Sequence, residues 1–236
     1  MRNRKNRISR AVTAMLILVM TTLIFMALHT GREVVERLDE YAVARTEYAD
    51  LRDLAGAGVI PPLVGGEVDA EIEDTPHPSI EPSSTQLDWD ALRAINPDVV
   101  GWIVVPDTPI SYPIVRGQDN AHYLRHTFSG ERNASGAIFM DYRNSADFSD
   151  NQIILHGHNM RDGSMFAPLH GWTGDYFIIH TPDGIMVFEV FDRRMVSATD
   201  EIYQLHDMEN GEQIVTLSTC VNGRAEMRFV VRGIKG

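Results

Sequence analysis

The sequence predicts a mainly β fold: a closed barrel of eight short strands with short helices outside it, preceded by an N-terminal transmembrane helix and a stalk. Three observations lead to this prediction. An uncharged apolar stretch lies near the N-terminus, and a segment rich in Pro, Gly and acidic residues follows it. The rest of the chain holds short runs of β-forming residues, many bounded by Gly, Pro, Asn or Asp. A β-sandwich would give the same spacing; we favour the barrel.

The composition is that of an ordinary globular protein. Its 236 residues are 44% hydrophobic and 23% charged, which excludes a chain disordered throughout, a fibrous repeat and a membrane protein with many spans. Lys and Arg number 21 against 33 Asp and Glu, and an acidic body argues against nucleic acid as a partner, because phosphate binding needs a basic surface. The single cysteine, Cys220, excludes an internal disulfide and a multi-cysteine metal site.

Residues 1–31 predict a membrane anchor. Residues 1–10 are rich in Arg and Lys, and no charged residue occurs from 11 to 31. As a helix, the uncharged run would extend about 31 Å, which matches a hydrocarbon core of about 30 Å. Under the positive-inside rule, 1–10 is a cytoplasmic basic segment, 11–31 is the transmembrane anchor and the C-terminal body is extracellular. The alternative is a cleaved signal peptide, but the run is long and 27–31 is a poor cleavage site.

Residues 32–86 are predicted to be a helical stalk followed by a flexible linker. From 32 to 55 the chain is charged, with apolar residues at roughly helical spacing, which is typical of a short amphipathic helix. From 56 to 86 it carries Pro-Pro, Gly-Gly, an acidic run and Ser-Ser, a composition that indicates a spacer.

The working domain is predicted over residues 87–236. Asp88 is a suitable N-cap for a short helix at 89–95, which Asn96-Pro97 would end. Two further helical pieces are expected near 120–126 and 165–170. The predicted strands are 99–105, 110–115, 137–141, 152–156, 176–181, 185–191, 213–219 and 229–234.

Candidate catalytic groups gather at two predicted strand ends. Cys220 follows the strand 213–219 and precedes an Asn-Gly turn, so its thiol should lie near the rim of the domain. The strand 152–156 runs into His156-Gly157-His158, where the glycine permits an unusual turn or close packing, and either histidine can face a cleft. A cysteine nucleophile needs an adjacent base or a group that favours the thiolate, and histidine and arginine supply this.

Arg228 is the arginine expected beside the cysteine. It opens the last predicted strand, and antiparallel pairing with 213–219 across the turn at 221–227 would bring it near Cys220. An arginine there can stabilise a thiolate or the oxyanion of a tetrahedral intermediate. Arg224 in the turn is interpreted as a solvated charge, and Arg232 lies further along the strand.

Together, Thr216-Leu-Ser-Thr-Cys220, the Gly-His at an earlier strand end and the Arg opening the next strand resemble the sortases, which are extracellular, membrane-anchored cysteine transpeptidases of Gram-positive bacteria. The likeness covers roughly residues 87–236. Several further stretches resemble class B sortases in particular, namely Asn-Pro-Asp-Val-Val-Gly-Trp-Ile at 96–103, Tyr-Pro-Ile-Val at 112–115, Gly-Ala-Ile-Phe-Met-Asp-Tyr at 136–142 and His-Asn-Met at 158–160.

The resemblance implies roles for individual residues. Cys220 would be the nucleophile, His158 the catalytic histidine, because it directly follows the glycine, and Arg228 the essential arginine. His156 stands where class B members commonly have an aromatic residue and is expected to be a neighbour of the site. The substrate-binding positions implied are Asn120, Leu124, Thr199, Tyr203, Ser218 and Thr219, with the Thr219 backbone as a possible oxyanion donor.

The resemblance also implies a reaction. Sortases cleave a sorting signal near the C-terminus of a secreted protein, of Pro-x-Thr type, after the Thr. They form a thioacyl intermediate and pass the protein to an amine of the cell-wall peptidoglycan. No cofactor and no metal ion are implied. The expected partners are secreted proteins that carry the signal, the amine of the peptidoglycan cross-bridge and, through the N-terminal helix, the membrane.

One departure from the family concerns the substrate groove. Class B enzymes usually carry a long insertion with a helix before the cysteine strand, whereas residues 192–212 form a short segment here. This leaves the groove wall and the exact sorting motif open, and it does not touch the three predicted catalytic residues.

Other functions stay open. A pilin-polymerising sortase uses the same thioester with a lysine acceptor; no lid segment or C-terminal span is identified here, so wall anchoring is favoured. A zinc-dependent hydrolase would use His156 and His158, since alternate strand residues face one side, with Asp162 and His170 as further ligands. A non-catalytic surface-binding module would keep Cys220 buried.

Overall fold

The computed structural model describes residues 2–56, 87–205 and 211–236. Contacts group the chain into two compact units, Met1–Ala42 and Val43–Gly236. The long helix α1 (Arg2–Leu54) contributes to both. Most of the predicted flexible linker, 57–86, lies outside the described residues. The predicted domain bounds, 1–10, 11–31, 32–86 and 87–236, stay predictions.

The first unit is helical throughout its described length. The predicted anchor and stalk form one helix without a break between them. The stretch Met15–Leu54 contains a window with a mean hydropathy of 1.6, so it is long and apolar enough to cross a membrane by length and composition. The hydroxyls of Thr21 and Thr22 donate to the Leu18 carbonyl at 2.9 and 2.8 Å, which satisfies these polar groups within the helix.

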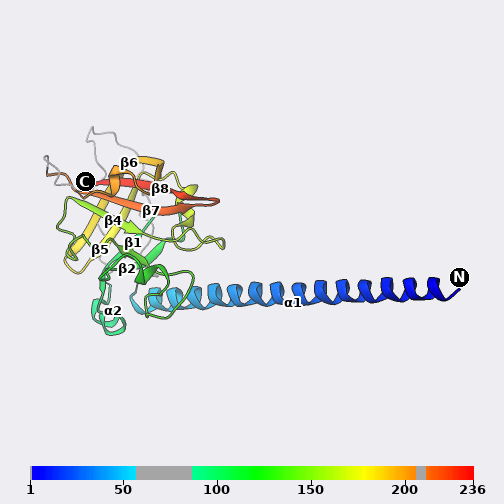
Figure 1. The fold of residues 1–236 in the computed structure, drawn as a ribbon. Coiled ribbons are helices and arrows are strands. Elements are labelled where there is room, and N and C mark those ends of the chain that lie inside the picture. Colours follow the sequence, from blue (N-terminus) through cyan, green and yellow to red (C-terminus); the bar gives the residue numbers. More distant parts are fainter. Residues whose placement is uncertain (1, 57–86, 206–210) are drawn as a thin grey trace, which may run out of the picture. The chain divides into compact units, whose positions relative to one another are not determined.

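The second unit is built around a closed barrel of eight strands in the order β1-β2-β3-β4-β7-β8-β6-β5 (Figure 1). The pairs β2–β3 and β4–β7 are parallel and the others are antiparallel. The predicted mainly β barrel is therefore confirmed. The strands are β1 (Val99–Val104), β2 (Ser111–Val115), β3 (Ile138–Met140), β4 (Gln152–His156), β5 (Tyr176–Thr181), β6 (Gly184–Ser197), β7 (Ile214–Val221) and β8 (Arg224–Lys235).

The helices outside the barrel are short. Helix α2 (Trp89–Ile95) begins after Asp88, whose side chain accepts from the Ala91 N–H at 2.9 Å, and it ends at Asn96, as the capping pattern predicts. The predicted helical pieces near 120–126 and 165–170 are single 3₁₀ turns, η2 (His122–Leu124) and η3 (Ala167–His170). A third turn, η4 (Glu201–Tyr203), lies between β6 and β7.

Large apolar side chains fill the interior of the barrel. Burying each one contributes roughly 1.5–3 kcal/mol relative to leaving it exposed. The central residues of β4 are buried continuously rather than alternately, as expected for a strand with a parallel neighbour and cover on both faces. Fully buried members of this core include Trp102, Ile103, Ile114, Ile138, Phe177, Phe188, Leu217 and Val231.

Strand β6 extends further than the sequence predicts. The predicted strand 185–191 continues through a register shift between Val190 and Asp192, after which pairing with β8 runs on to Ser197 opposite Met227. A bulge moves later side chains to the other face, so the polar residues after it do not show a strand pattern in the sequence. The connection from β6 to the cysteine strand is consequently even shorter than the predicted segment 192–212.

The last turns of α1 pack against the barrel within the second unit. Tyr48 is 2% exposed, its hydroxyl donates to the Gly136 carbonyl at 2.7 Å, and its ring meets the Tyr112 ring edge-on at 5.2 Å. Burial raises the pKa of Tyr48 well above its ordinary value. Arg45 pairs with Asp162 at 3.1 Å. The predicted stalk therefore ends as part of the folded domain.

Candidate active site

Cys220 and Arg228 lie opposite each other on neighbouring strands. Strands β7 and β8 pair antiparallel, and Cys220 is the direct partner of Arg228. Directly opposed residues of an antiparallel pair project to the same face, with Cβ atoms about 4.5–5.5 Å apart. The Cys220 side chain is exposed at the end of β7. The predicted pairing of Cys220 with Arg228 is confirmed, but the predicted turn at 221–227 is wrong: Val221 already pairs with Arg224, and a register shift sets Arg228 opposite Cys220.

His158 reaches the same region from the other side of β7. Strand β4 runs parallel to β7 with His156 beside Ser218, and the Gly157 N–H donates to the Ser218 carbonyl at 3.1 Å. A Cβ on Gly157 would lie 2.5 Å from Cδ1 of Ile138 and 2.6 Å from Cδ2 of Phe166. The glycine is therefore required by close packing, and it lets the chain carry His158 past the strand end towards Cys220.

A backbone carbonyl fixes the imidazole of His158. Its Nε2 lies 2.7 Å from the Leu124 carbonyl oxygen. Because a carbonyl accepts hydrogen bonds and cannot donate them, Nε2 carries a proton and donates. Nδ1 is then the ring nitrogen that can exchange a proton with a substrate. Leu124 thus holds the histidine through its backbone, while its exposed side chain lines the pocket.

The guanidinium of Arg228 is held by carbonyls of its own strand. Nη1 donates to the Ala225 and Met227 carbonyls at 2.7 and 3.0 Å. The ladder between β7 and β8 shifts register just after Cys220, which turns these carbonyls towards the arginine. A guanidinium has five N–H donors, so further donors remain for a substrate carbonyl or an oxyanion.

These three side chains line one pocket, which has a volume of about 310 Å³. Ser218 and Thr219 form part of its wall and are 3% and 1% exposed. Thr199, which was predicted to bind substrate, is not among the described lining residues, whereas its neighbour Ala198 is. The Thr199 hydroxyl lies 3.0 Å from that of Ser197. The full lining is Asn120, Leu124, Phe139, Asp141, Arg143, His156, Gly157, His158, Ala198, Tyr203, Ser218, Thr219, Cys220 and Arg228. The catalytic and binding roles of the predicted residues stay predictions.

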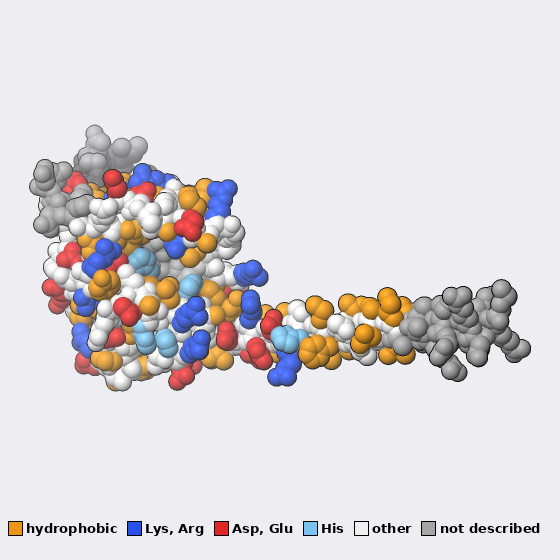
Figure 2. Space-filling model, in the orientation of Figure 1, with side chains coloured by type: hydrophobic (Ala, Val, Ile, Leu, Met, Phe, Trp, Pro, Cys, Tyr) orange, Lys and Arg blue, Asp and Glu red, His pale blue; other side chains and the backbone are white. Residues whose placement is uncertain are grey.

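Figure 2 shows Lys, Arg and His side chains interspersed with acidic and hydrophobic ones over the visible face of the second unit.

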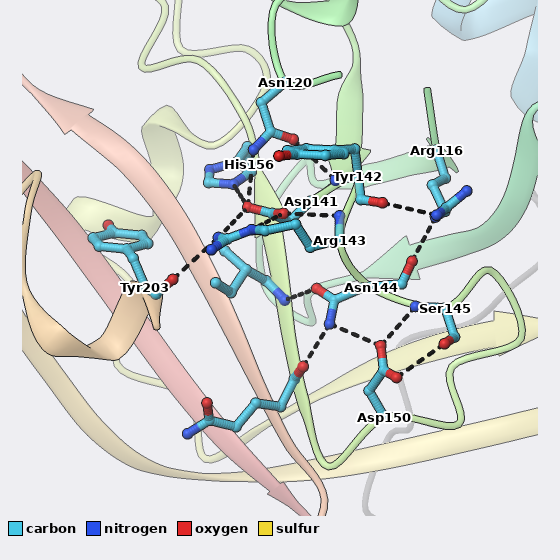
Figure 3. Close-up of polar contacts among 12 residues, drawn as sticks. Arg116, Asn120, Asp141, Tyr142, Arg143, Asn144, Ser145, Asp150, His156 and Tyr203 are labelled. Carbon is cyan, nitrogen blue, oxygen red and sulfur yellow. Dashed lines mark hydrogen bonds and ion pairs between the residues drawn. The ribbon is translucent and has the colours of Figure 1, made fainter. Parts of the chain in front are cut away.

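A buried carboxylate organises the floor of the pocket (Figure 3). Asp141, whose side chain is 2% exposed, accepts from Nε and Nη2 of Arg143 at 2.8 Å each and from Asn120 Nδ2 at 2.9 Å. His156 Nε2 lies 3.5 Å from the same carboxylate. Burial alone would raise the pKa of Asp141, but the hydrogen bonds from Arg143 and His156 outweigh it and hold this pKa far below its usual range.

The floor is connected to the wall of the pocket. Arg143 Nη2 also donates to the Tyr203 carbonyl at 3.0 Å (Figure 3). The Tyr203 hydroxyl lies 2.7 Å from Oγ of Ser218. Burial raises the pKa of Tyr203. The short segment before β7 is thereby fastened at Tyr203. Sequence reasoning missed Asp141 and Arg143. The available signal was a charged pair at the end of the predicted strand 137–141.

The two neighbouring histidines direct their Nε2 atoms at different partners. His156 faces Asp141, whereas His158 faces the Leu124 carbonyl. Within residues 2–56, 87–205 and 211–236, no three His, Cys, Asp or Glu side chains gather as a metal site would require. The arrangement expected for the zinc-dependent alternative, with His156 and His158 as joint ligands, does not occur among these residues.

Comparisons with known proteins agree with this geometry. Residues 103–235 match the family model described as a sortase domain. Sortase B of Listeria monocytogenes is 39% identical over 119 residues, which are 48% of each chain. A crystal structure of sortase B from Bacillus anthracis is 29% identical, with a TM-score of 0.62, over 84% of this chain and 98% of that one. A Streptococcus pyogenes class B sortase involved in pilus biogenesis is 29% identical, with a TM-score of 0.56, over 63% of this chain and 98% of that one.

The match to the curated Listeria relative spans about half of that protein's length. The family model covers more than half of this chain and includes Cys220, His158 and Arg228. The resemblance seen in the sequence motifs is therefore confirmed, and the similar proteins are class B sortases. The chain belongs to the sortase family.

Proposed function

We propose that this chain is a membrane-anchored cysteine transpeptidase of class B type, which cleaves a C-terminal Pro-x-Thr sorting signal after the Thr and transfers the protein to a peptidoglycan amine. The observation that carries the proposal is that the Cys220 thiol is exposed, and that it lines one pocket together with His158 and Arg228. A nucleophile, a proton-transfer group and an oxyanion stabiliser are the parts that acyl transfer requires.

The first half-reaction forms a thioester. The Cys220 thiolate attacks the carbonyl carbon of the Thr, and Arg228 donates to the oxygen that becomes negative. The tetrahedral intermediate collapses with cleavage of the C–N bond, and protonated His158 gives the Nδ1 proton to the departing amine. The acyl group is now on sulfur, and His158 is neutral with its proton on Nε2, where the Leu124 carbonyl holds it.

The second half-reaction reverses these roles. An incoming amine attacks the thioester carbonyl, and neutral His158 takes the amine's proton on Nδ1. The C–S bond breaks, the new amide leaves and the thiolate returns. Because the thioester preserves most of the free energy of the original peptide bond, the exchange needs no ATP.

The N-terminal part of α1 would anchor the enzyme in the membrane. Its apolar stretch is suited to cross a membrane, and the basic residues at 1–10 favour the cytoplasm. The C-terminal domain would then lie outside the cell, where secreted proteins and wall precursors meet. Protease added to intact cells should cleave the domain, whereas a domain protected until lysis would contradict this orientation.

A pilin-polymerising activity is the second candidate. One similar structure is a class B sortase involved in pilus biogenesis, so class B architecture occurs in a protein with that role. The two activities share the thioester and differ in the amine that resolves it. A lysine side chain of a protein partner would be the acceptor in the pilus reaction, and a peptidoglycan amine in wall anchoring.

The test uses full-length protein in detergent micelles with a set of Pro-x-Thr peptides and two kinds of amine. We expect mass spectrometry to show peptide cut after Thr and joined to amine, and the preferred amine distinguishes the two candidates. Cys220→Ala is the matched negative control. Peptide cleavage that persists in Cys220→Ala and disappears on zinc chelation would overturn the proposal in favour of a metal hydrolase. If no peptide is cut and Cys220 does not react with iodoacetamide, a binding module would replace it.

A further inference from the structure

We propose that Asn159 and His170 are positioning residues which hold the carbonyl of Cys220 and thereby fix the nucleophile between His158 and Arg228; the inference rests on the proposed function. Asn159 Nδ2 lies 2.9 Å and His170 Nε2 lies 3.0 Å from the Cys220 carbonyl oxygen. We call this pair the carbonyl clamp. Neither residue lines the pocket itself.

The clamp begins where the regular sheet ends. The Ser218 carbonyl accepts from Gly157, which is the last ladder contact between the β4 side and β7. Carbonyls two residues apart in a strand point the same way, so the Cys220 carbonyl faces the space beyond β4. The Asn159 and His170 side chains take the place that a backbone N–H would have had. On the other side of β7, the ladder to β8 shifts register just after Cys220.

The clamp depends on which ring nitrogen of His170 carries the proton. The Cys220 carbonyl only accepts, so its 3.0 Å contact with His170 is a hydrogen bond in the tautomer that carries the proton on Nε2, and the clamp takes this tautomer. Asn159 Nδ2 donates to the same oxygen, which has two lone pairs. In this tautomer the 3.0 Å contact between Nδ2 of Asn159 and Nε2 of His170 joins two donors and is not a hydrogen bond, whereas in the other tautomer Nε2 would accept from Asn159 and would not bond to Cys220.

The clamp links the three segments that carry the catalytic residues. Asn159 directly follows His158 in the chain. His170 bonds to the backbone of Cys220, and its ring stacks on Phe229, the neighbour of Arg228, with centroids 4.7 Å apart. A displacement of about 1 Å at a reacting centre can cost a hundredfold in rate. Fixing the backbone of an exposed nucleophile at a strand end is therefore worth more to catalysis than to stability.

Two substitutions at His170 separate the donor from the ring. His170→Phe keeps an aromatic ring against Phe229 and removes the N–H, whereas His170→Gln keeps an N–H of similar reach and removes the ring. With full-length protein and a Pro-x-Thr peptide, we expect His170→Phe and Asn159→Leu each to lower kcat about ten- to a hundredfold with KM nearly unchanged. His170→Gln should retain most of the wild-type kcat. His122→Phe is the matched control, because His122 is exposed, stacks on His126 and does not line the pocket.

Three results would overturn the positioning role. They are a wild-type kcat in His170→Phe, a higher kcat in His170→Phe than in His170→Gln, and a fall in kcat that is explained by a lowered Tm. The rate of Cys220 alkylation by iodoacetamide gives a readout that needs no peptide. The clamp predicts slower alkylation in His170→Phe and Asn159→Leu than in the wild type and in His170→Gln, and equal rates would contradict it. If the alkylation rates of the four proteins differ as predicted and the wild type still transfers no peptide, the proposed function fails while the clamp stands.

Discussion

The carboxylate on the floor of the pocket is enclosed and held by fixed hydrogen bonds, whereas the thiol at its rim is exposed. Asp141, on the floor, is 2% exposed and accepts from Arg143 and Asn120. Cys220, at the rim, has an exposed side chain, and its fixed contacts run through the backbone. Buried charges must be paired, while a nucleophile must stay accessible. The difference teaches that the floor maintains the shape of the pocket and the rim carries the chemistry.

The largest expected effect comes from removing the thiol at the rim. Cys220→Ala cannot form a thioester, so peptide transfer should fall to background. Because the side chain is exposed, Tm should stay close to that of the wild type. Transfer assays and thermal melts of the same preparation check both statements. A Cys220→Ala protein that is unfolded, or that still transfers peptide, would remove the distinction between rim and floor.

A second rim substitution tests the role of the guanidinium. Arg228→Lys keeps a positive charge and loses the planar fork of donors, and we expect kcat/KM to fall about 10²–10³-fold, as for loss of one oxyanion donor. Arg224→Lys is the matched control, since Arg224 lies on the same strand, is exposed and does not line the pocket. Equal effects of the two substitutions would show that Arg228 acts through general charge alone.

On the floor, the expected loss is of stability. Asp141→Asn removes the charge that Arg143 pairs with, and hydrogen bonds to charged groups are worth about 1.5–3 kcal/mol. For a domain of this size, Tm should fall by about 2–4 °C for each kcal/mol. Asp183→Asn is the control, because Asp183 is exposed in the turn between β5 and β6. An unchanged Tm in Asp141→Asn would mean that the network is not structural.

The smallest expected effect is a change in the stability contributed by Asp141 at acid pH. The pKa of Asp141 lies far below its ordinary value in the folded protein, so its ionised form stabilises the fold above about pH 4 and that stability is lost as the pH falls further. The difference in Tm between wild type and Asp141→Asn should therefore be full at pH 7 and shrink below pH 4. A difference that grows on acidification would reverse the assigned sign.

The sequence allowed the strands and the Cys220–Arg228 pairing to be predicted, but not the bulged hairpin that produces the pairing. Runs of β-forming residues bounded by Gly, Pro, Asn or Asp locate the strands. The predicted turn at 221–227 is wrong: Val221 pairs with Arg224, and a register shift then sets Arg228 opposite Cys220. The choice of His158 over His156 depended on the family resemblance. The structure adds a local reason for the glycine between them, since a Cβ on Gly157 would clash with Ile138 and Phe166.

Other features could not be predicted, because they join residues far apart in the chain. Asp141 meets His156 and Arg143 meets Tyr203 only once the barrel closes. Asn159 and His170 converge on Cys220 from a loop and a 3₁₀ turn, which show no periodic signal. The length of β6 was hidden by the bulge at 190–192, which reverses the alternation of side chains.

Trapping the thioester tests the central claim most directly. Full-length protein is mixed with a Pro-x-Thr peptide in the absence of an acceptor amine, and its intact mass is followed. The account predicts a mass increase equal to the peptide up to and including Thr, mapped to Cys220 and released by hydroxylamine. An adduct on another residue, or peptide cleavage with Cys220 remaining unmodified throughout, would contradict the account.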